Sequence, residues 1–200
     1  MYSQNEVQED IQSKLNNINA AFYATNPKKT FFKDAQKIEC AEYVTQKIDA
    51  ETLIKNTVYV LPNTNKVFFN YSLFKRYANP AIYTSIIKYI LQLIDSCIKC
   101  YNTFEMHVDL NTFSVSAAHR YKGAIEMFCL ECLSSDSKTA IYEHLTRFYI
   151  YNIPSMIDHI SVILNPFINE QIKSKIEHVS KRDSASQLEQ FYQGTLGSPI

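Results

Sequence analysis

The first part of the chain has the hydrophobic periodicity of two amphipathic helices. Within residues 5–23 and again within 33–49, apolar side chains recur at steps of three and four, which places them on one helix face. The positions are Val7, Ile11, Leu15, Ile18 and Phe22, followed by Ile38, Ala41, Val44 and Ile48. Asn26 and Pro27 lie in the loop between the two segments. We therefore predict an N-terminal helical segment over residues 1–55.

Strand patterns alternate with helix patterns in the rest of the chain. Apolar runs or strict alternation predict strands at residues 57–61, 67–69, 103–110 and 148–151. Helical periodicity lies between and after them, at residues 82–101, 116–133, 155–167, 168–182 and 184–193. This order predicts an α/β fold, a three-layer α/β/α sandwich with a mixed, mostly parallel sheet. We expect this domain to span residues 56–200.

The composition excludes several classes of protein. The 200 residues include 20 Lys and Arg and 20 Asp and Glu, and a net charge of zero argues against binding to nucleic acid. Three glycines cannot supply a glycine-rich phosphate loop. The polar N-terminus does not resemble a signal peptide, and the apolar residues 82–98 are too few and too interrupted to span a bilayer. We expect a cytoplasmic protein whose membrane contact is at most peripheral.

The cysteines are the strongest candidates for a metal site. Cys97 and Cys100 form one CxxC pair, and Cys129 and Cys132 form a second. The gap between the pairs is longer than the roughly 15–20 residues of structural zinc sites, and both pairs fall within apolar helical periodicity. We therefore predict core cysteines, no metal site and no cofactor. Because no spacing of Ser, His, Cys and Asp defines a catalytic group, we also predict that the protein is not an enzyme.

The helix predicted at residues 155–167 has a wide apolar face. Met156, Ile157, Ile160, Leu164 and Phe167 all belong to it. Such a face is typical of a core helix, but also of a movable lid over an apolar cavity or of a helix that lies among lipid headgroups. The pattern alone leaves these interpretations open.

Three motifs in the C-terminal half carry a resemblance to a known family. Phe148 begins the run Phe-Tyr-Ile-Tyr-Asn-Ile-Pro-Ser-Met-Ile, Leu164 begins Leu-Asn-Pro-Phe-Ile, and Lys173 begins Lys-Ser-Lys-Ile. Together they resemble the CRAL-TRIO lipid-binding domain, which has an apolar strand ending in Asn-x-Pro, an apolar gate helix, Pro-Phe-Leu and a closing Lys-Ile. The resemblance covers roughly residues 56–195.

The resemblance implies an α/β/α sandwich whose sheet floors an apolar pocket and whose gate helix closes it. It also implies a lipid or another hydrophobic small molecule as the ligand, and a transient contact with a membrane surface. The pocket residues that we expect are Phe104, Met106, Val108, Tyr149, Tyr151, Met156, Ile157, Ile160, Leu164 and Phe167.

Two polar residues match positions that hold the inositol headgroup in the phosphatidylinositol-transfer branch of the family. These are Glu143, just before the Asn-x-Pro strand, and Lys175, in the closing Lys-Ile. Ile172 and His144 depart from the family pattern, which has Thr and Arg at these places. The resemblance therefore implies Glu143 and Lys175 as ligand-binding residues.

A second function is consistent with the same resemblance. Short CRAL-TRIO-like domains also resemble protein-interaction adaptors that bind a small GTPase or another protein. The polar alternation of Glu105, His107 and Asp109 favours this alternative, since a lipid pocket needs an apolar floor. A carrier should contain an apolar cavity of several hundred cubic ångströms, whereas an adaptor should have a filled core and an exposed apolar patch.

Overall fold

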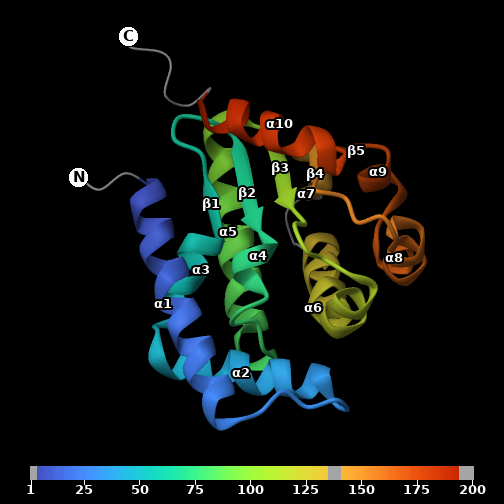
Figure 1. The fold of residues 1–200 in the computed structure, drawn as a ribbon. Helices are drawn as coiled ribbons and strands as arrows, with labels where there is room; N and C mark the ends of the chain where they lie inside the picture. The colour runs from blue at the N-terminus through green and yellow to red at the C-terminus, as the bar shows by residue number, and fades with distance from the viewer. Residues whose placement is uncertain (1–3, 135–140, 194–200) are drawn as a thin grey trace.

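The computed structural model describes residues 4–134 and 141–193 and contains one mixed sheet (Figure 1). Its five strands lie in sequential order, and they are β1 (Val58–Val60), β2 (Lys66–Asn70), β3 (Phe104–Asp109), β4 (Leu145–Tyr151) and β5 (Ile176–His178). β1 pairs antiparallel with β2, and the other three pairings are parallel. The predicted mixed, mostly parallel sheet is confirmed.

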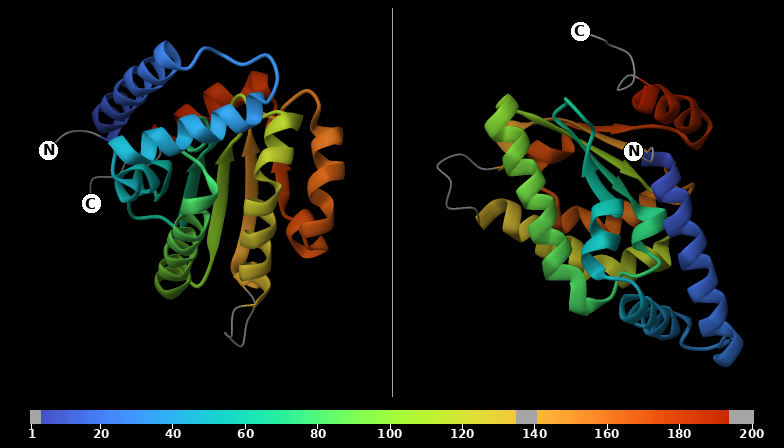
Figure 2. Two further views of the ribbon diagram at one scale, coloured as in Figure 1. Left: turned by 90° about the horizontal axis from the view of Figure 1, so that it is seen from below. Right: turned by 90° about the vertical axis from the view of Figure 1, so that its left-hand side faces the viewer.

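Helices cover both faces of the sheet. They are α1 (Gln4–Thr25), α2 (Lys33–Lys47), α3 (Ala50–Thr57), α4 (Tyr71–Phe74), α5 (Tyr83–Tyr101), α6 (Val115–Ser134), α7 (Ile141–His144), α8 (Ile157–Leu164), α9 (Glu170–Lys173) and α10 (Lys181–Gln193), with 3-10 turns η1 (Pro80–Ile82) and η2 (Asn165–Phe167). Right-handed crossovers between sequential parallel strands place the connecting helices on one face. Figure 2 shows α10 on the opposite face, which confirms the predicted α/β/α sandwich.

The alternation along β3 sorts its side chains between these two helical layers. Phe104 and Met106 are buried in the main core, on the side of α5 and α6. His107, on the other side, is also buried, and its ring lies against Phe191 of α10. The polar face of this strand is therefore covered by α10, and its apolar face remains available as a floor.

The N-terminal helices share the main hydrophobic core with the sheet domain. Leu15 of α1, Val44 of α2 and Leu53 of α3 are fully buried in the same cluster as residues of α5 and β3. Asp49 is the N-cap of α3, and its carboxylate accepts a hydrogen bond of 2.9 Å from the Thr52 amide. The division between residues 55 and 56 falls within α3 and stays a prediction.

The segment between η2 and α10 differs from the sequence-based expectation. Residues 168–182 were predicted to be helical, but the structure has the short helix α9 followed by the strand β5. A strand of three residues is too short to produce a clear period of two, and pairing of Ile176 and His178 with β4 determines its conformation.

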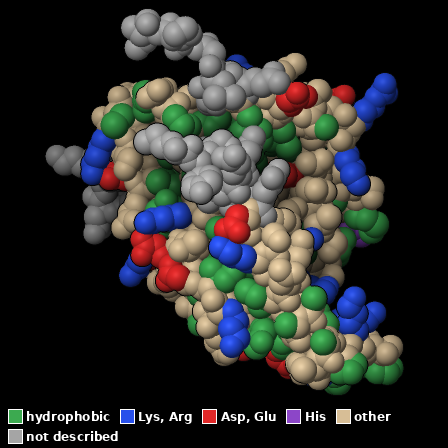
Figure 3. Space-filling model, turned by 60° about the vertical axis from the view of Figure 1, so that its left-hand side comes forward, with side chains coloured by type: hydrophobic (Ala, Val, Ile, Leu, Met, Phe, Trp, Pro, Cys, Tyr) green, Lys and Arg blue, Asp and Glu red, His purple; other side chains and the backbone are tan. Residues whose placement is uncertain are grey.

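Helix α5 and its preceding turn form a long apolar helical segment. By length and composition alone, Pro80–Tyr101 would suffice to cross a membrane. Its inner face, which includes Ile86, Ile90 and Ile94, is buried in the main core, as in a core helix of a globular domain. On the face shown in Figure 3, basic side chains are interspersed with acidic and hydrophobic ones.

Candidate functional site

An apolar cavity of about 440 Å³ lies between the sheet and the helices α6 and α8. Its floor is formed by side chains of β3, β4 and the loop after β3, namely Val108, Leu110, Phe148 and Ile150. The register pairs Met106 with Phe148 and Val108 with Ile150. Because side chains alternate along a strand, these residues point to the same face of the sheet. Two adjacent parallel strands thus provide one apolar surface.

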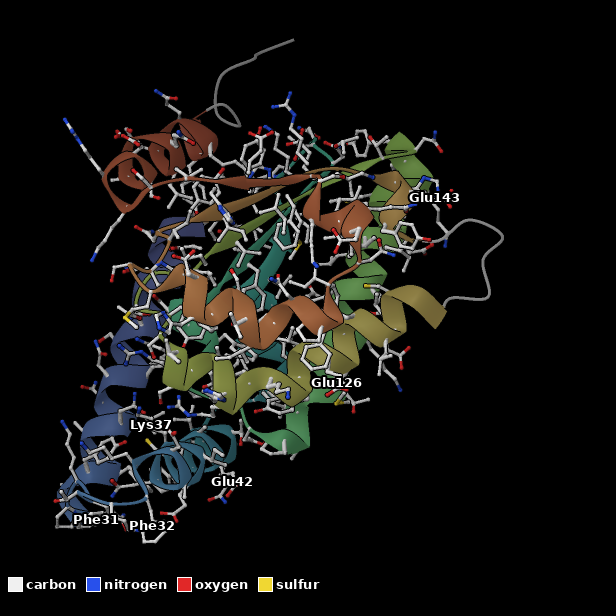
Figure 4. All side chains as sticks on the ribbon, turned by 90° about the vertical axis from the view of Figure 1, so that its right-hand side faces the viewer. Phe31, Phe32, Lys37, Glu42, Glu126 and Glu143 are labelled. Atoms are coloured by element: carbon white, nitrogen blue, oxygen red, sulfur yellow. The ribbon has the colours of Figure 1, made fainter. Side chains whose placement is uncertain are left out.

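The walls of the cavity come from helices that connect the strands. Helix α6 contributes Tyr121, Ile125 and Phe128, and helix α8 contributes Ile157, Ile160, Ser161 and Leu164. In Figure 4 these two helices lie side by side below the sheet. The helix α8 has only eight residues and covers one side of the cavity.

Polar groups are few, and apart from Tyr71, Tyr121 and Cys129 they come from α8 and the segment that follows it. They are Ser161, Asn165, Lys173 and His178. The Lys173 Nζ lies 2.6 Å from the Glu170 carboxylate, in the first turn of α9. The cavity therefore combines a large apolar surface with one cation, the arrangement that suits an amphipathic ligand.

Four of the predicted pocket residues line this cavity, namely Val108, Ile157, Ile160 and Leu164. The others are not among its lining residues. Phe104 and Met106 are buried in the adjoining core, Met156 is half exposed at the start of α8, and Phe167 lies under the Lys122 ammonium at 5.3 Å.

Tyr149 and Tyr151 lie on the opposite face of the sheet, which corrects their predicted place in the cavity. The Tyr151 hydroxyl is 2.9 Å from Nδ1 of His107, and the Tyr149 ring stacks on the His107 ring at 4.8 Å. The Glu105 carboxylate lies 3.1 Å from Nε2. Burial lowers the pKa of His107, although Glu105 acts in the opposite direction. The strand β4 lies where the Asn-x-Pro motif predicts it, but Tyr149 and Tyr151 of this motif point to the side of the sheet that α10 covers.

Glu143 and Lys175 lie at the amino ends of β4 and β5, and neither lines the cavity. The Lys175 Nζ donates a hydrogen bond of 2.8 Å to the Tyr142 carbonyl, and Glu143 is exposed on α7 (Figure 4). A role in binding a headgroup stays a prediction for both residues.

Several lining residues were not predicted as part of the site. Phe148 and Ile150 lie on the other face of the same alternation along β4, so the strand pattern itself contains a signal for them. Tyr121, Ile125 and Phe128 were visible as an apolar helix face, but no local signal distinguishes a helix that lines a cavity from one that fills a core. Ile176 belongs to the strand that was not predicted.

The two CxxC pairs lie on α5 and α6, and all five cysteines are free. Burial raises the pKa of Cys132 to about 12, so its thiol is protonated. Within residues 4–134 and 141–193, no group of three or more His, Cys, Asp and Glu side chains is placed to hold a metal ion.

An apolar cavity between a mixed sheet and a short covering helix defines a class of α/β domain with room for a hydrophobic ligand. A family model of the CRAL/TRIO domain matches residues 63–195, which is more than half of the chain. The chain therefore belongs to the CRAL/TRIO domain family, a family of lipid-binding and lipid-transfer domains that are generally not enzymes.

A solved structure supports the fold. The structure of Sfh5, a yeast Sec14-like protein, is similar to this chain with a TM-score of 0.53 and 15% sequence identity. The similarity covers 78% of this chain and 58% of Sfh5, so the chain spans little more than half of that protein. No curated protein sequence matches the chain significantly.

Proposed function

We propose that this protein is a lipid carrier or sensor that binds one lipophilic ligand in the cavity between the sheet and α8. The observation that carries the proposal is the apolar cavity of about 440 Å³, a volume in the usual range of ligand sites. Each methylene that moves from water into such a site contributes about 0.8 kcal/mol. A single acyl chain therefore supplies ample affinity without any catalytic residue.

Helix α8 is proposed as the gate through which the ligand enters. Its inner side chains, Ile157, Ile160 and Leu164, face the cavity, whereas Val162 on its outer side is 75% exposed. Met127 and Leu130 of α6 are also exposed. Because an exposed apolar side chain is stabilised at a lipid interface, we propose that the gate opens in contact with a membrane.

For the polar end of the ligand, the geometry favours Lys173 over Lys175. Replacing Lys173 by Gln is expected to weaken the binding of phosphatidylinositol about five- to tenfold, because one charge-assisted contact is lost. Lys175→Gln is the matched control, and we expect it to bind as the wild type does, since the Lys175 Nζ donates to a backbone carbonyl outside the cavity. Uptake of labelled phosphatidylinositol from vesicles measures both variants. If only Lys175→Gln loses binding, the headgroup lies at the amino ends of β4 and β5 instead.

Native mass spectrometry of the purified protein, followed by solvent extraction, tests the proposed function. We expect close to one equivalent of a lipid or sterol, or uptake of one equivalent after incubation with lipid vesicles. A protein that is empty and takes up no lipid from vesicles would contradict the proposal.

The alternative function is a non-enzymatic adaptor that binds a small GTPase or another protein. The exposed apolar residues Met127, Leu130 and Val162 favour it. An adaptor has no need of an apolar cavity, however, and the polar face of β3 is on the side of α10. If the protein is empty and also takes up no lipid from vesicles, the next experiment is a search for a protein partner that contacts the exposed residues.

A further inference from the structure

A second pocket, lined by basic side chains, lies next to the apolar cavity. It has a volume of about 370 Å³ and lies between α1, α2, the end of α4 and the first turns of α6. Lys37, Lys75, Arg76 and Arg120 line it, and no carboxylate is among its lining residues. Figure 4 labels Lys37 between α2 and the start of α6. The Tyr71 ring lines both pockets and forms part of the wall between them.

Arg120 is the most deeply buried cation of this pocket. Only 6% of its side chain is exposed. One guanidinium nitrogen donates to the Asp34 carboxylate, but Nε is buried and has no hydrogen-bond partner. A buried, charged donor without a partner is costly, and negative charge in the pocket that Arg120 lines would offset part of this cost.

In the part of the chain that the structure describes, no carboxylate forms a salt bridge with Lys75 or Arg76. The Lys75 Nζ donates to the Thr112 hydroxyl at 2.6 Å, and an Arg76 nitrogen donates to the Asn16 side-chain oxygen at 2.7 Å. Both acceptors are neutral. Burial lowers the pKa of Lys75, and the nearby charges of Arg76 and Lys37 act in the same direction.

One carboxylate, that of Asp34, faces this group of cations. It pairs with Arg120 and lies 3.6 Å from the Lys37 Nζ. Ser114 and Ala117, at the start of α6, also line the pocket, so the positive end of this long helix dipole faces the same space. Four cations and one carboxylate give this region a net positive charge, which a ligand with two or three negative charges would neutralise.

We propose that this pocket binds a phosphate-bearing anion. Guanidinium groups bind phosphate oxygens through paired hydrogen bonds, and lysine acts as a point charge toward them, so this set of cations suits phosphate better than a single carboxylate. The volume admits a phosphorylated inositol or a molecule of that size. The site is independent of the apolar cavity and does not rest on the lipid-carrier function.

Two kinds of ligand carry such a phosphate, namely a soluble molecule and the headgroup of a membrane lipid. Phe31 and Phe32, in the loop between α1 and α2, are 77% and 81% exposed, and Figure 4 shows both at the edge of the molecule. Lys37 lines both the basic pocket and a surface hollow beside these rings. A membrane source would place the two rings in the lipid interface, next to the pocket.

The first measurement is calorimetric titration of the full chain with inositol trisphosphate. We expect binding by the wild type, and a loss of at least about tenfold in the double variant Lys75→Gln/Arg76→Gln, since two charge-assisted contacts are removed. The control is Lys99→Gln, an exposed lysine of α5 that pairs with Asp95, and it should bind as the wild type does. Thermal melting checks that each variant folds, and the anion should raise the melting temperature of the wild type more than that of the double variant.

Flotation with phosphatidylcholine vesicles, with and without phosphatidylinositol bisphosphate, distinguishes the two sources. For a membrane source, flotation requires the bisphosphate, and Phe31→Ser/Phe32→Ser abolishes it while inositol trisphosphate binding is retained. For a soluble source, inositol trisphosphate binds and the protein does not float. The proposal is overturned if neither probe binds, or if the folded double variant binds both as tightly as the wild type.

Discussion

Replacement of Leu15 by Ala is expected to lower the free energy of unfolding by about 3 kcal/mol. Leu15 lies on α1 but is fully buried in the core cluster that also contains residues of α5 and β3. Removing a buried leucine side chain loses its transfer free energy and leaves a cavity, which together cost about 2–5 kcal/mol. For a chain of this length, about 3 kcal/mol corresponds to a decrease of roughly 6–12 °C in the melting temperature.

The matched control is Leu130→Ala on α6, because 57% of Leu130 is exposed. We expect this variant to change the free energy of unfolding by no more than about 0.5 kcal/mol. Urea denaturation followed by circular dichroism measures both. If Leu15→Ala unfolds at the same midpoint as the wild type, the N-terminal helices fold separately from the sheet domain, as a free appendage would.

Replacement of Ser161 by Trp is expected to block ligand uptake. Ser161 lines the cavity from α8, so an indole at this position would occupy space that the ligand needs. If the ring excludes about three methylenes of a lipid chain, the loss is about 2.4 kcal/mol, or roughly fiftyfold in affinity. Transfer of a fluorescent lipid from donor vesicles to the protein measures the effect.

Ser161→Ala is the control for this variant, since it removes the hydroxyl without filling the cavity. It should take up lipid as the wild type does. The melting temperature of Ser161→Trp should stay close to that of the wild type, because the ring enters an existing space rather than a packed core. Unchanged lipid uptake by a folded Ser161→Trp would place the ligand elsewhere.

Much of the fold could be predicted because it depends on local patterns. The alternation along residues 104–109 defines a strand with one apolar face, and β–α alternation predicts parallel pairing. The apolar face of residues 157–164 was also visible, and three of its side chains line the cavity. The strand β5 was missed because its three residues depend on pairing with β4 rather than on a pattern of their own.

The candidate site was predicted only in part, since its shape depends on residues far apart in the chain. Motif resemblance located β4 correctly, but the pairing with β3 and the position of α10 decide that Phe148 and Ile150, not Tyr149 and Tyr151, face the cavity. The volume left between the sheet, α6 and α8 is a property of packing, which hydrophobic periodicity does not encode.

By itself, the sequence determined the order of the strands β1 to β4 and of the main helices between them, the apolar face of α8 and a net charge of zero. The tertiary structure alone decided where the charges gather. Lys37, Lys75, Arg76 and Arg120 come from three separate segments, and folding brings them into one pocket with no lining carboxylate. Composition averages charge over the whole chain, whereas electrostatic interactions depend on distance in space, so a locally basic pocket is invisible until the fold is known.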